Sequence, residues 1–279
     1  MWQLKSVQDK ESAARLADIL SEIADATSWF EDPKGWGVLA IFETKPVEEG
    51  LNELFAAAGL SVNYILEALE QRDWLAENRK HFPALTIGNF YIYGSHITDP
   101  LPADKICLLI DAATAFGTGQ HGTTQGCLAA LQRLASDKLS PKRVLDLGCG
   151  TAILAMAAAR LFPNSTIIAA DNDEEAVMRA RLNSIDNALD AIEVCLSEGF
   201  SHEDLHHPHD LILANILAEP LIHLARDMYR YTAGGGFVIL SGLLVSQQQA
   251  VVDAYLQQGF QLIEAQHIGE WATLLLRKP

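Results

Sequence analysis

Apolar residues along residues 1–70 follow strand-like and helix-like patterns in turn. Strands are predicted at residues 2–7, 36–42 and 62–68, and helices at residues 12–24, where apolar residues recur at helical spacing, and 47–58. A polar turn from Asp32 to Gly35 lies between two strand candidates and favours a hairpin. This order of strand, helix, two strands, helix and strand predicts a small α+β, ferredoxin-like domain over residues 1–72.

From about residue 85 the pattern changes to a regular alternation. Short strand-like runs cover residues 106–110, 144–147, 167–170, 192–195, 211–214 and 237–240. Helical stretches cover residues 123–135, 153–161, 174–184, 219–231 and 246–258. Alternating strands and helices predict a parallel, doubly wound α/β sheet with helices on both faces. Residues 73–85 are interpreted as the linker to this Rossmann-like domain, residues 86–279.

The C-terminus departs from this alternation. Residues 261–266 and 272–277 are two strand candidates joined by a short turn near Gly269 and Glu270. A hairpin cannot join two parallel strands, so one of the two must run antiparallel. A mostly parallel sheet with such a C-terminal hairpin is typical of class I methyltransferases rather than of dehydrogenases.

Composition and cysteine content favour a soluble, cytoplasmic protein. Apolar residues make up 49% of the 279 residues, and no apolar run reaches the ~18–20 residues needed to span a bilayer. The N-terminus lacks the basic-then-apolar plan of a secretory signal. The four cysteines are scattered and form no Cys-x-x-Cys pair, which indicates reduced thiols rather than disulfides or zinc ligands.

The net charge of the chain indicates which kinds of binding partner to expect. The chain has 20 Lys and Arg residues against 36 Asp and Glu residues, a formal net charge of −16. Such a surface repels phosphates, which argues against direct binding of nucleic acid, and it attracts basic proteins. A basic protein substrate is therefore expected, although acidity that only maintains solubility stays an alternative.

A glycine-rich turn carries the strongest chemical signal. The predicted strand at 144–147 leads into Gly148 and Gly150, which let the backbone pass close to a ligand, and then into a helix whose first N–H groups are free. Asp171 ends the next strand, where a carboxylate can accept hydrogen bonds from both hydroxyls of a ribose. Together these residues predict a site for an adenosine-containing ligand, with a turn used only for packing as the alternative.

Two cofactors that contain adenosine could fit this site. A dinucleotide fingerprint requires a third glycine where this chain has Ile153. Asp146, at the head of the turn, would also be unfavourable beside a pyrophosphate but suits a cationic sulfonium. S-Adenosylmethionine is therefore favoured over a nicotinamide dinucleotide.

Two further segments are predicted to reach the same edge of the sheet. Residues 111–124 mix glycines with hydroxyl residues and are interpreted as a lid over the cofactor, followed by a helix that Thr124 could cap. The strand at 211–214 leads to Asn215, whose side-chain oxygen could accept a hydrogen bond from a substrate amine, with helix capping as the alternative. His121 is a less favoured base. No metal is expected, because the four histidines between residues 202 and 209 lie in a polar loop without an ordered set of acids.

The motifs together closely resemble one protein family. Phe-Gly-Thr-Gly-Gln-His-Gly-Thr-Thr, Asp-Leu-Gly-Cys-Gly-Thr-Ala and Ala-Asn-Ile-Leu-Ala, with the block at residues 233–247, are similar to those of the ribosomal protein L-eleven (L11) methyltransferases. The resemblance is strong over residues 105–279 and extends to residues 1–85 only in layout. It implies a small domain that binds the ribosomal protein and a class I domain that methylates its amines. It further implies cofactor contacts at Thr124, Gly148, Asp171 and Asn215.

The predicted function is therefore transfer of methyl groups from S-adenosylmethionine to lysine ε-amines, the α-amine, or both, of L11, with Asn215 as the catalytic residue. Two positions depart from the family pattern, Ala152 in place of a glycine and Gly122 in place of a proline. A lysine methyltransferase acting on another protein, such as the electron-transfer flavoprotein β subunit, is the first alternative. An NAD-dependent oxidoreductase and a binding module without catalysis are the others.

Overall fold

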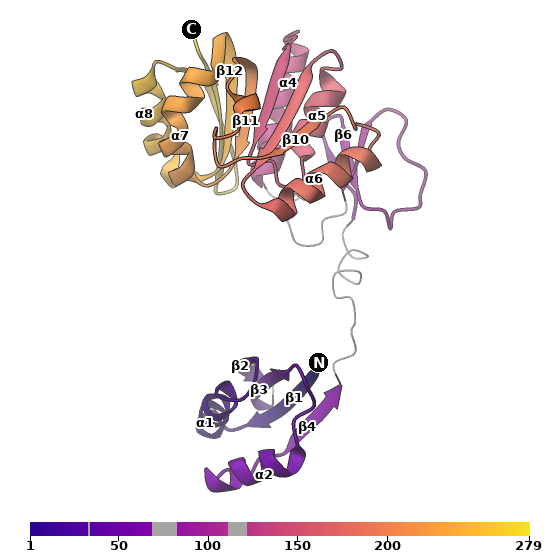
Figure 1. Cartoon of the computed structure of the whole chain (residues 1–279), viewed down its shortest axis with the longest axis vertical. Coiled ribbons are helices and arrows are strands. Elements are labelled where there is room, and N and C mark those ends of the chain that lie inside the picture. The colour runs from indigo at the N-terminus through magenta and orange to yellow at the C-terminus, as the bar shows by residue number, and fades with distance from the viewer. Residues whose placement is uncertain (33, 69–82, 111–121) are drawn as a thin grey trace. The chain divides into compact units, whose positions relative to one another are not determined.

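The computed structural model describes residues 1–32, 34–68, 83–110 and 122–279 (Figure 1). The chain divides into two compact units, residues 1–77 and residues 78–279. No helix within the described ranges is long and apolar enough to cross a membrane.

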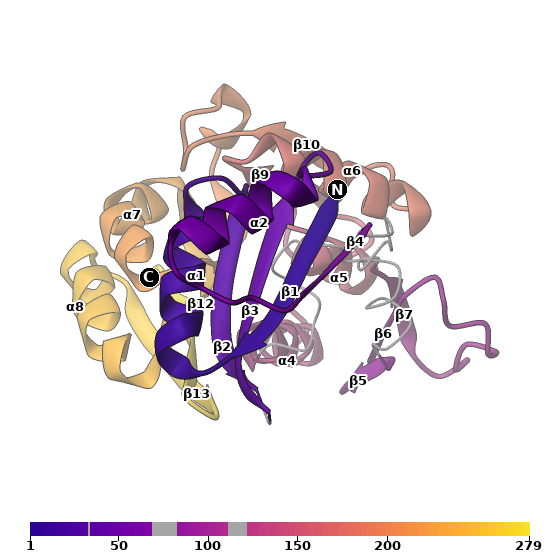
Figure 2. The same ribbon diagram turned by 90° about the horizontal axis from the view of Figure 1, so that it is seen from below.

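The small unit is a four-stranded sheet covered on one face by two helices. Its elements are β1 (Trp2–Gln8), α1 (Lys10–Ser21), β2 (Ala26–Asp32), β3 (Gly35–Phe42), α2 (Glu48–Ala57) and β4 (Tyr64–Ala68). All its strand pairs are antiparallel, in the order β2-β3-β1-β4. Both helices pack against the same side of the sheet, which Figure 2 shows with the helices in front. This is the ferredoxin-like arrangement that the sequence predicts.

The large unit is built on a seven-stranded sheet in the order β10-β9-β8-β11-β12-β14-β13. The strands are β8 (Arg143–Leu147), β9 (Thr166–Asp171), β10 (Glu193–Leu196), β11 (His209–Asn215), β12 (Thr232–Leu244), β13 (Gln261–Ile268) and β14 (Trp271–Arg277). All pairs are parallel except those of β14, which runs antiparallel to both β12 and β13. The predicted α/β class with an antiparallel C-terminal hairpin is confirmed, and β14 is the reversed strand.

Helices cover both faces of this sheet (Figure 1). They are α4 (Gly122–Ser136), α5 (Ile153–Leu161), α6 (Glu174–Asp186), α7 (Ala218–Tyr231) and α8 (Gln248–Gln258). The first three pack in one apolar core and the last two in another. Successive strand residues alternate between the cores, as Leu211 and Leu213 do against Ile212 and Ala214. Burial on both faces explains why these strands are continuous apolar runs in the sequence.

One predicted strand belongs to a different sheet. Residues 106–110 are expected to open the doubly wound sheet, but β7 (Ile106–Leu109) pairs in parallel with β6 (Phe90–Tyr93), which pairs with β5 (Leu85–Ile87). The side chain of Asn187 accepts a hydrogen bond from Leu109 N and donates one to Leu109 O. The amide of Asn187 therefore takes the place of a neighbouring strand at Leu109.

Candidate cofactor and substrate site

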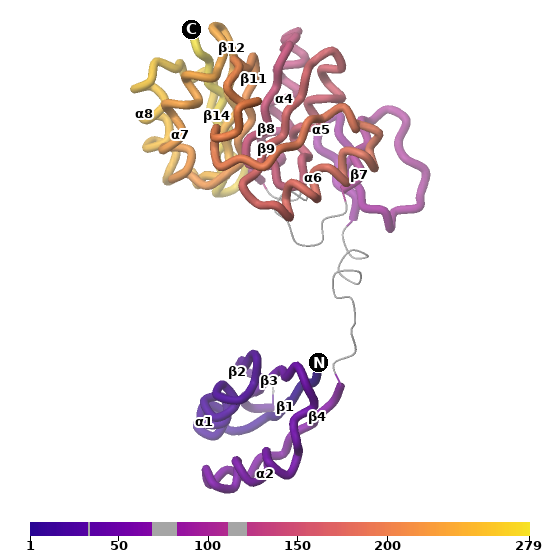
Figure 3. The backbone as a smooth tube through the Cα atoms, in the orientation of Figure 1, coloured from indigo at the N-terminus to yellow at the C-terminus, as the bar shows by residue number. Residues whose placement is uncertain are grey.

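The register of three strands brings the predicted site residues to one edge of the sheet. Leu147 of β8 is paired with Ala170 of β9 on one side and with Ala214 of β11 on the other. The next residues along the three strands are Gly148, Asp171 and Asn215. They therefore lie level with one another at the carboxyl ends of β8, β9 and β11, the position where open α/β sheets bind ligands. Figure 3 traces the backbone through these strands.

The turn between β8 and α5 is tight and held by backbone hydrogen bonds. Gly148 N and Cys149 N both donate to Ala170 O, at 2.8 and 3.0 Å. Gly148 and Gly150 have φ angles of 70° and 53°, in the left-handed region. Ala152 shares that conformation, with φ 61°, which gives a physical reason for a glycine at this position in the family pattern.

Asp171 is half-buried and is oriented by the turn. Its Oδ2 accepts a hydrogen bond from Gly150 N at 2.8 Å, and its Oδ1 accepts one from Asp173 N at 3.1 Å. A carboxylate offers about four lone-pair positions, so both oxygens retain capacity for further donors. The arrangement suits a pair of ribose hydroxyls at the sheet edge.

Asp146 has a different environment from Asp171. Its side chain is 1% exposed, and Oδ2 accepts a hydrogen bond from Ala155 N, in the first turn of α5, at 2.9 Å. Burial raises the pKa of Asp146 to about 8, although the hydrogen bond from Ala155 opposes this, and the charge of Asp171 adds to the rise. The sequence interpretation set Asp146 beside a cationic ligand, whereas its carboxyl group holds the start of α5.

Asn215 and Thr124 meet although 91 positions separate them. Asn215 Nδ2 donates to Thr124 Oγ1 at 3.4 Å. Thr124 is buried inside the first turn of α4, and Asn215 is half-buried. The N-cap of α7 is Leu217, so Asn215 does not cap that helix. The capping alternative is therefore wrong, and no residue that the structure describes donates a hydrogen bond to the amide oxygen of Asn215.

A fourth strand end lies beside these residues and was not singled out from the sequence. Leu196, the last residue of β10, is paired with Asp171, and Ser197 N donates to Asp171 O at 2.7 Å. The turn from Ser197 to Ser201 is thus a further candidate for contact with the base of a nucleoside. The rule that parallel strands end at one edge could have identified it.

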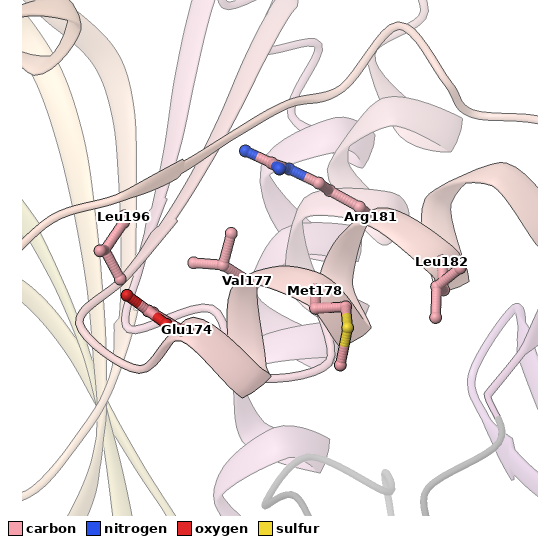
Figure 4. Close-up of a pocket in the computed structure, with 6 residues that line it drawn as sticks. All are labelled: Glu174, Val177, Met178, Arg181, Leu182 and Leu196. Carbon is pink, nitrogen blue, oxygen red and sulfur yellow. The ribbon is translucent and has the colours of Figure 1, made fainter.

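A cavity of about 430 Å³ lies along α6 and the end of β10 (Figure 4). It is lined by Glu174, Val177, Met178, Arg181, Leu182 and Leu196. This lining includes none of the predicted site residues, so strand ends rather than this cavity define the site. Of the predicted lid, residues 111–124, residues 111–121 with His121 lie outside the described residues, and residues 122–124 form the start of α4.

No metal-binding cluster is present among the side chains that the structure describes. His206 stacks on Tyr231 and its Nε2 bonds to Phe200 O, and His209 is fully buried. These two histidines therefore have packing roles in the described part of the chain.

Comparison with known proteins identifies relatives over the whole chain. The family model described as ribosomal protein L11 methyltransferase (PrmA) matches residues 2–279. A ribosomal protein L11 methyltransferase of Bradyrhizobium diazoefficiens is 38% identical, covering 98% of this chain and 96% of its own. A ribosomal protein L11 methyltransferase from a Caulobacter species is 39% identical, covering 97% of this chain and 94% of its own. A crystal structure of a ribosomal protein L11 methylase from Lactobacillus delbrueckii subsp. bulgaricus has a TM-score of 0.65 and 27% identity, covering 71% of this chain and 100% of that one.

Proposed function

The chain belongs to the ribosomal protein L11 methyltransferase family, and we propose that it methylates amines of ribosomal protein L11 in the cytoplasm, with S-adenosylmethionine as the methyl donor. The observation that carries the proposal is the alignment of Gly148, Asp171 and Asn215 at one sheet edge. The proposal is supported by the positions of Asp171 and Asn215 on either side of the glycine turn, where a carboxylate could bind the nucleoside and an amide oxygen could accept a hydrogen bond from the amine. The family assignment gives no support to an oxidoreductase.

The residues present fit S-adenosylmethionine. When bound, it supplies an electrophilic methyl group on a positively charged sulfur. Asp171, oriented by Gly150 N, would accept hydrogen bonds from the ribose, and the first N–H groups of α5 follow the same turn. The carboxylate of Asp171 at this edge would be unfavourable beside a pyrophosphate, whereas Asp146 is buried and holds the start of α5.

This site is proposed to catalyse the reaction mainly by positioning the amine and the methyl donor. Displacement at the methyl carbon is in line and leaves a neutral thioether, so no acid is needed. Asn215 accepts a hydrogen bond from the incoming amine and aims its lone pair, and positioning of two reactants contributes as much as ~7–11 kcal/mol in favourable cases.

The acceptor amine must first lose a proton. At pH 7 this costs about 4–5 kcal/mol for a lysine ε-amine and about 1 kcal/mol for an α-amine, from unperturbed pKa values of ~10.4 and ~7.7–8.0. The amide of Asn215 does not act as a base at this pH. Lysine methylation is therefore expected to rise more steeply with pH than α-amine methylation between about pH 7 and 9.

We assign recognition of the protein substrate to the small unit. The face of its sheet opposite the helices carries Val7, Phe30 and Ile65, which are 44%, 49% and 62% exposed. Residues 1–72 contain 6 basic and 13 acidic residues, a net charge of −7. A sheet face with exposed apolar side chains on an acidic unit suits a basic protein such as a ribosomal protein.

The assay for the whole proposal uses the full chain, purified L11 and S-adenosylmethionine. Mass spectrometry of L11 is expected to show added methyl groups, with site-resolved rates at about pH 7 and 9 separating the two kinds of amine. Unmodified L11 would contradict the proposal. Methylation of the electron-transfer flavoprotein β subunit in place of L11 would instead support the alternative substrate.

Variants on the small unit test recognition separately. Phe30→Lys and Ile65→Lys place a positive charge on the open face, so the KM for L11 is expected to rise about tenfold, the size of a single anchor residue in an interface. Val47→Lys is the matched control, because Val47 is 71% exposed at the start of α2 and away from that face. Equal KM values for all three variants would remove this face from recognition.

A further inference from the structure

Ile216, the residue after Asn215, is held between two glycines from neighbouring strands. A Cβ atom added to Gly148 would lie 2.3 Å from Ile216 Cγ2. A Cβ added to Gly242 would lie 2.2 Å from Ile216 O, 2.7 Å from its carbonyl carbon and 2.9 Å from its N. Real Cβ atoms essentially never make contacts under 3.0 Å. Gly148 and Gly242 therefore both lie closer to Ile216 than a residue with a Cβ atom could.

Gly242 reaches this position because β12 is irregular there. The register between β12 and β14 shifts between Leu240 and Leu243, and Gly242 has a φ of 86°. Asn215 is paired with Ser241, the preceding residue of β12. The extra residue in β12 thus brings Gly242 against the backbone that leaves β11.

The two contacts join the two halves of the site. The peptide bond joins Ile216 N to Asn215, whose side-chain amide is proposed to accept a hydrogen bond from the amine. The backbone atoms that contact Gly242 are therefore next to Asn215 in the chain. The side chain of Ile216 meets Gly148, the first residue of the cofactor turn. Any displacement of Ile216 is therefore passed to both Asn215 and the turn.

We propose that Gly242 is a positioning residue: through Ile216 it sets the distance between Asn215 and the cofactor turn at Gly148. The inference rests on the proposed function for the roles of Asn215 and Gly148. Methyl transfer between two bound reactants is sensitive to their alignment, and a displacement of about 1 Å can cost roughly 10²-fold in rate. Gly242 itself need not touch either reactant.

The test compares three alanine variants of β12 in the full chain. Gly235→Ala controls for backbone strain, because Gly235 has a φ of 78° and its added Cβ would come no nearer than 3.9 Å to a described atom. Gly236→Ala controls for crowding, with contacts at 2.9 Å at the other end of the strand. Affinity for S-adenosylhomocysteine is measured by calorimetry and kcat is expressed per folded molecule.

All three variants are expected to lower the Tm, but only Gly242→Ala is expected to lower the affinity about tenfold and kcat about 10- to 100-fold. Gly242→Ala behaving like the two controls in both measurements would overturn the proposal. If the wild type binds S-adenosylhomocysteine but leaves L11 unmodified, the proposed substrate is wrong and the affinity comparison still decides the role of Gly242.

A second pair of variants covers the case in which Gly242→Ala does not fold. Ile216→Val keeps Cγ2, the atom that meets Gly148, whereas Ile216→Ala removes it. The valine variant is expected to retain wild-type affinity for S-adenosylhomocysteine and the alanine variant to lose about fivefold or more, the equivalent of ~1 kcal/mol. Equal affinities for the two would show that the contact does not position the turn.

Discussion

The two ends of the large unit's sheet use their polar groups differently. At the amino end, Asp210 Oδ2 accepts hydrogen bonds from both Lys142 N and Arg143 N, at 2.7 and 3.0 Å, and so fastens β11 to β8. Lys278 Nζ donates to Tyr229 O and Thr232 O, at 2.7 and 2.8 Å. The side chains of Asp210 and Lys278 thus bond to backbone groups at the ends of strands and of α7.

At the carboxyl end the polar side chains lie at the strand ends beside the glycine turn. Among the described residues, Asn215 donates one long hydrogen bond, at 3.4 Å, and Asp171 accepts backbone hydrogen bonds from Gly150 and Asp173, one on each oxygen, which leaves lone pairs on both. Asp210 and Asp171 each accept two backbone hydrogen bonds, so a ligand site is marked by its position at the carboxyl end of parallel strands and not by the number of hydrogen bonds left unmade, whereas the bonds at the amino end contribute to stability. Variants at the two ends should separate these roles.

The largest expected effect is loss of stability in acid through the amino end. His209 is fully buried there, its Nε2 bonded to Leu205 O, and burial lowers its pKa to about 4 from 6.5. The unfolded chain therefore binds the proton more tightly than the folded chain. This contribution to the free energy of unfolding is complete above pH 6.5 and falls as the pH drops towards 4, by about 3 kcal/mol at ~1.36 kcal/mol per unit.

Denaturant unfolding of the wild type and His209→Gln across this pH range measures the effect. Glutamine keeps a donor for Leu205 O but cannot be protonated, so its stability should fall less steeply with pH. Affinity for S-adenosylhomocysteine at neutral pH should be the same in both proteins. Parallel stability curves would show that His209 does not cause the acid sensitivity.

The next effect is on catalysis at the carboxyl end. Asn215→Ala removes the oxygen proposed to aim the amine, and kcat on L11 is expected to fall about 10²-fold, with little change in Tm because only a 3.4 Å hydrogen bond is lost.

Asn187→Ala is the matched control for Asn215→Ala. Asn187 is a buried amide in the same unit that bonds to Leu109 N and Leu109 O, so its loss should lower the Tm and leave kcat per folded molecule unchanged. Similar kcat values for the two variants would exclude a catalytic role for Asn215.

A pair of half-buried aspartates gives the third comparison. Asp171→Ala is expected to weaken binding of S-adenosylmethionine by about ten- to hundredfold, since a charged hydrogen-bond acceptor contributes roughly 1.5–3 kcal/mol. Asp210→Ala, at the opposite end, should lower the free energy of unfolding and leave affinity unchanged, because its two partners are backbone N–H groups of β8 and the residue before it. Calorimetry and denaturant unfolding of both variants decide between the roles, and unchanged affinity in Asp171→Ala would remove that residue from the site.

Local signals explain which parts of the fold could be predicted from the sequence. The helix predicted at 153–161 has those bounds in the structure, since its apolar stripe and glycine turn are local. α6 likewise begins directly after Asp173, whose side chain accepts from Glu175 N. The position of the site residues at one edge also follows, because parallel strands carry their ligands at one end.

Contacts between distant segments could not be predicted in this way. β7 pairs with β6 and bonds at Leu109 to Asn187, 78 positions away, and the partner of Asp146 depends on how α5 turns back on β8. Gly242 stands in an ordinary Ser-Gly-Leu-Leu sequence, and only the bulge in β12 brings it to Ile216. Periodicity identifies elements, whereas side-chain partners depend on tertiary register.

The smallest expected effect is at Ala152, inside the cofactor turn. This residue is fully buried with φ 61°, a conformation that costs a non-glycine residue roughly 1–2 kcal/mol. Ala152→Gly relieves that strain but removes a buried methyl group, worth about 0.8 kcal/mol, and gives the unfolded chain more freedom, worth about 0.5–1 kcal/mol. The terms nearly cancel, so the free energy of unfolding should change by less than about 1 kcal/mol and cofactor affinity should stay the same.

Ala152→Val is the opposing variant, because a branched side chain is both strained and too large there, and it should lower stability and affinity together. A marked gain of affinity in Ala152→Gly would show that the alanine distorts the turn, and the carboxyl end of this sheet would then be less well formed for its ligand than its hydrogen bonds indicate.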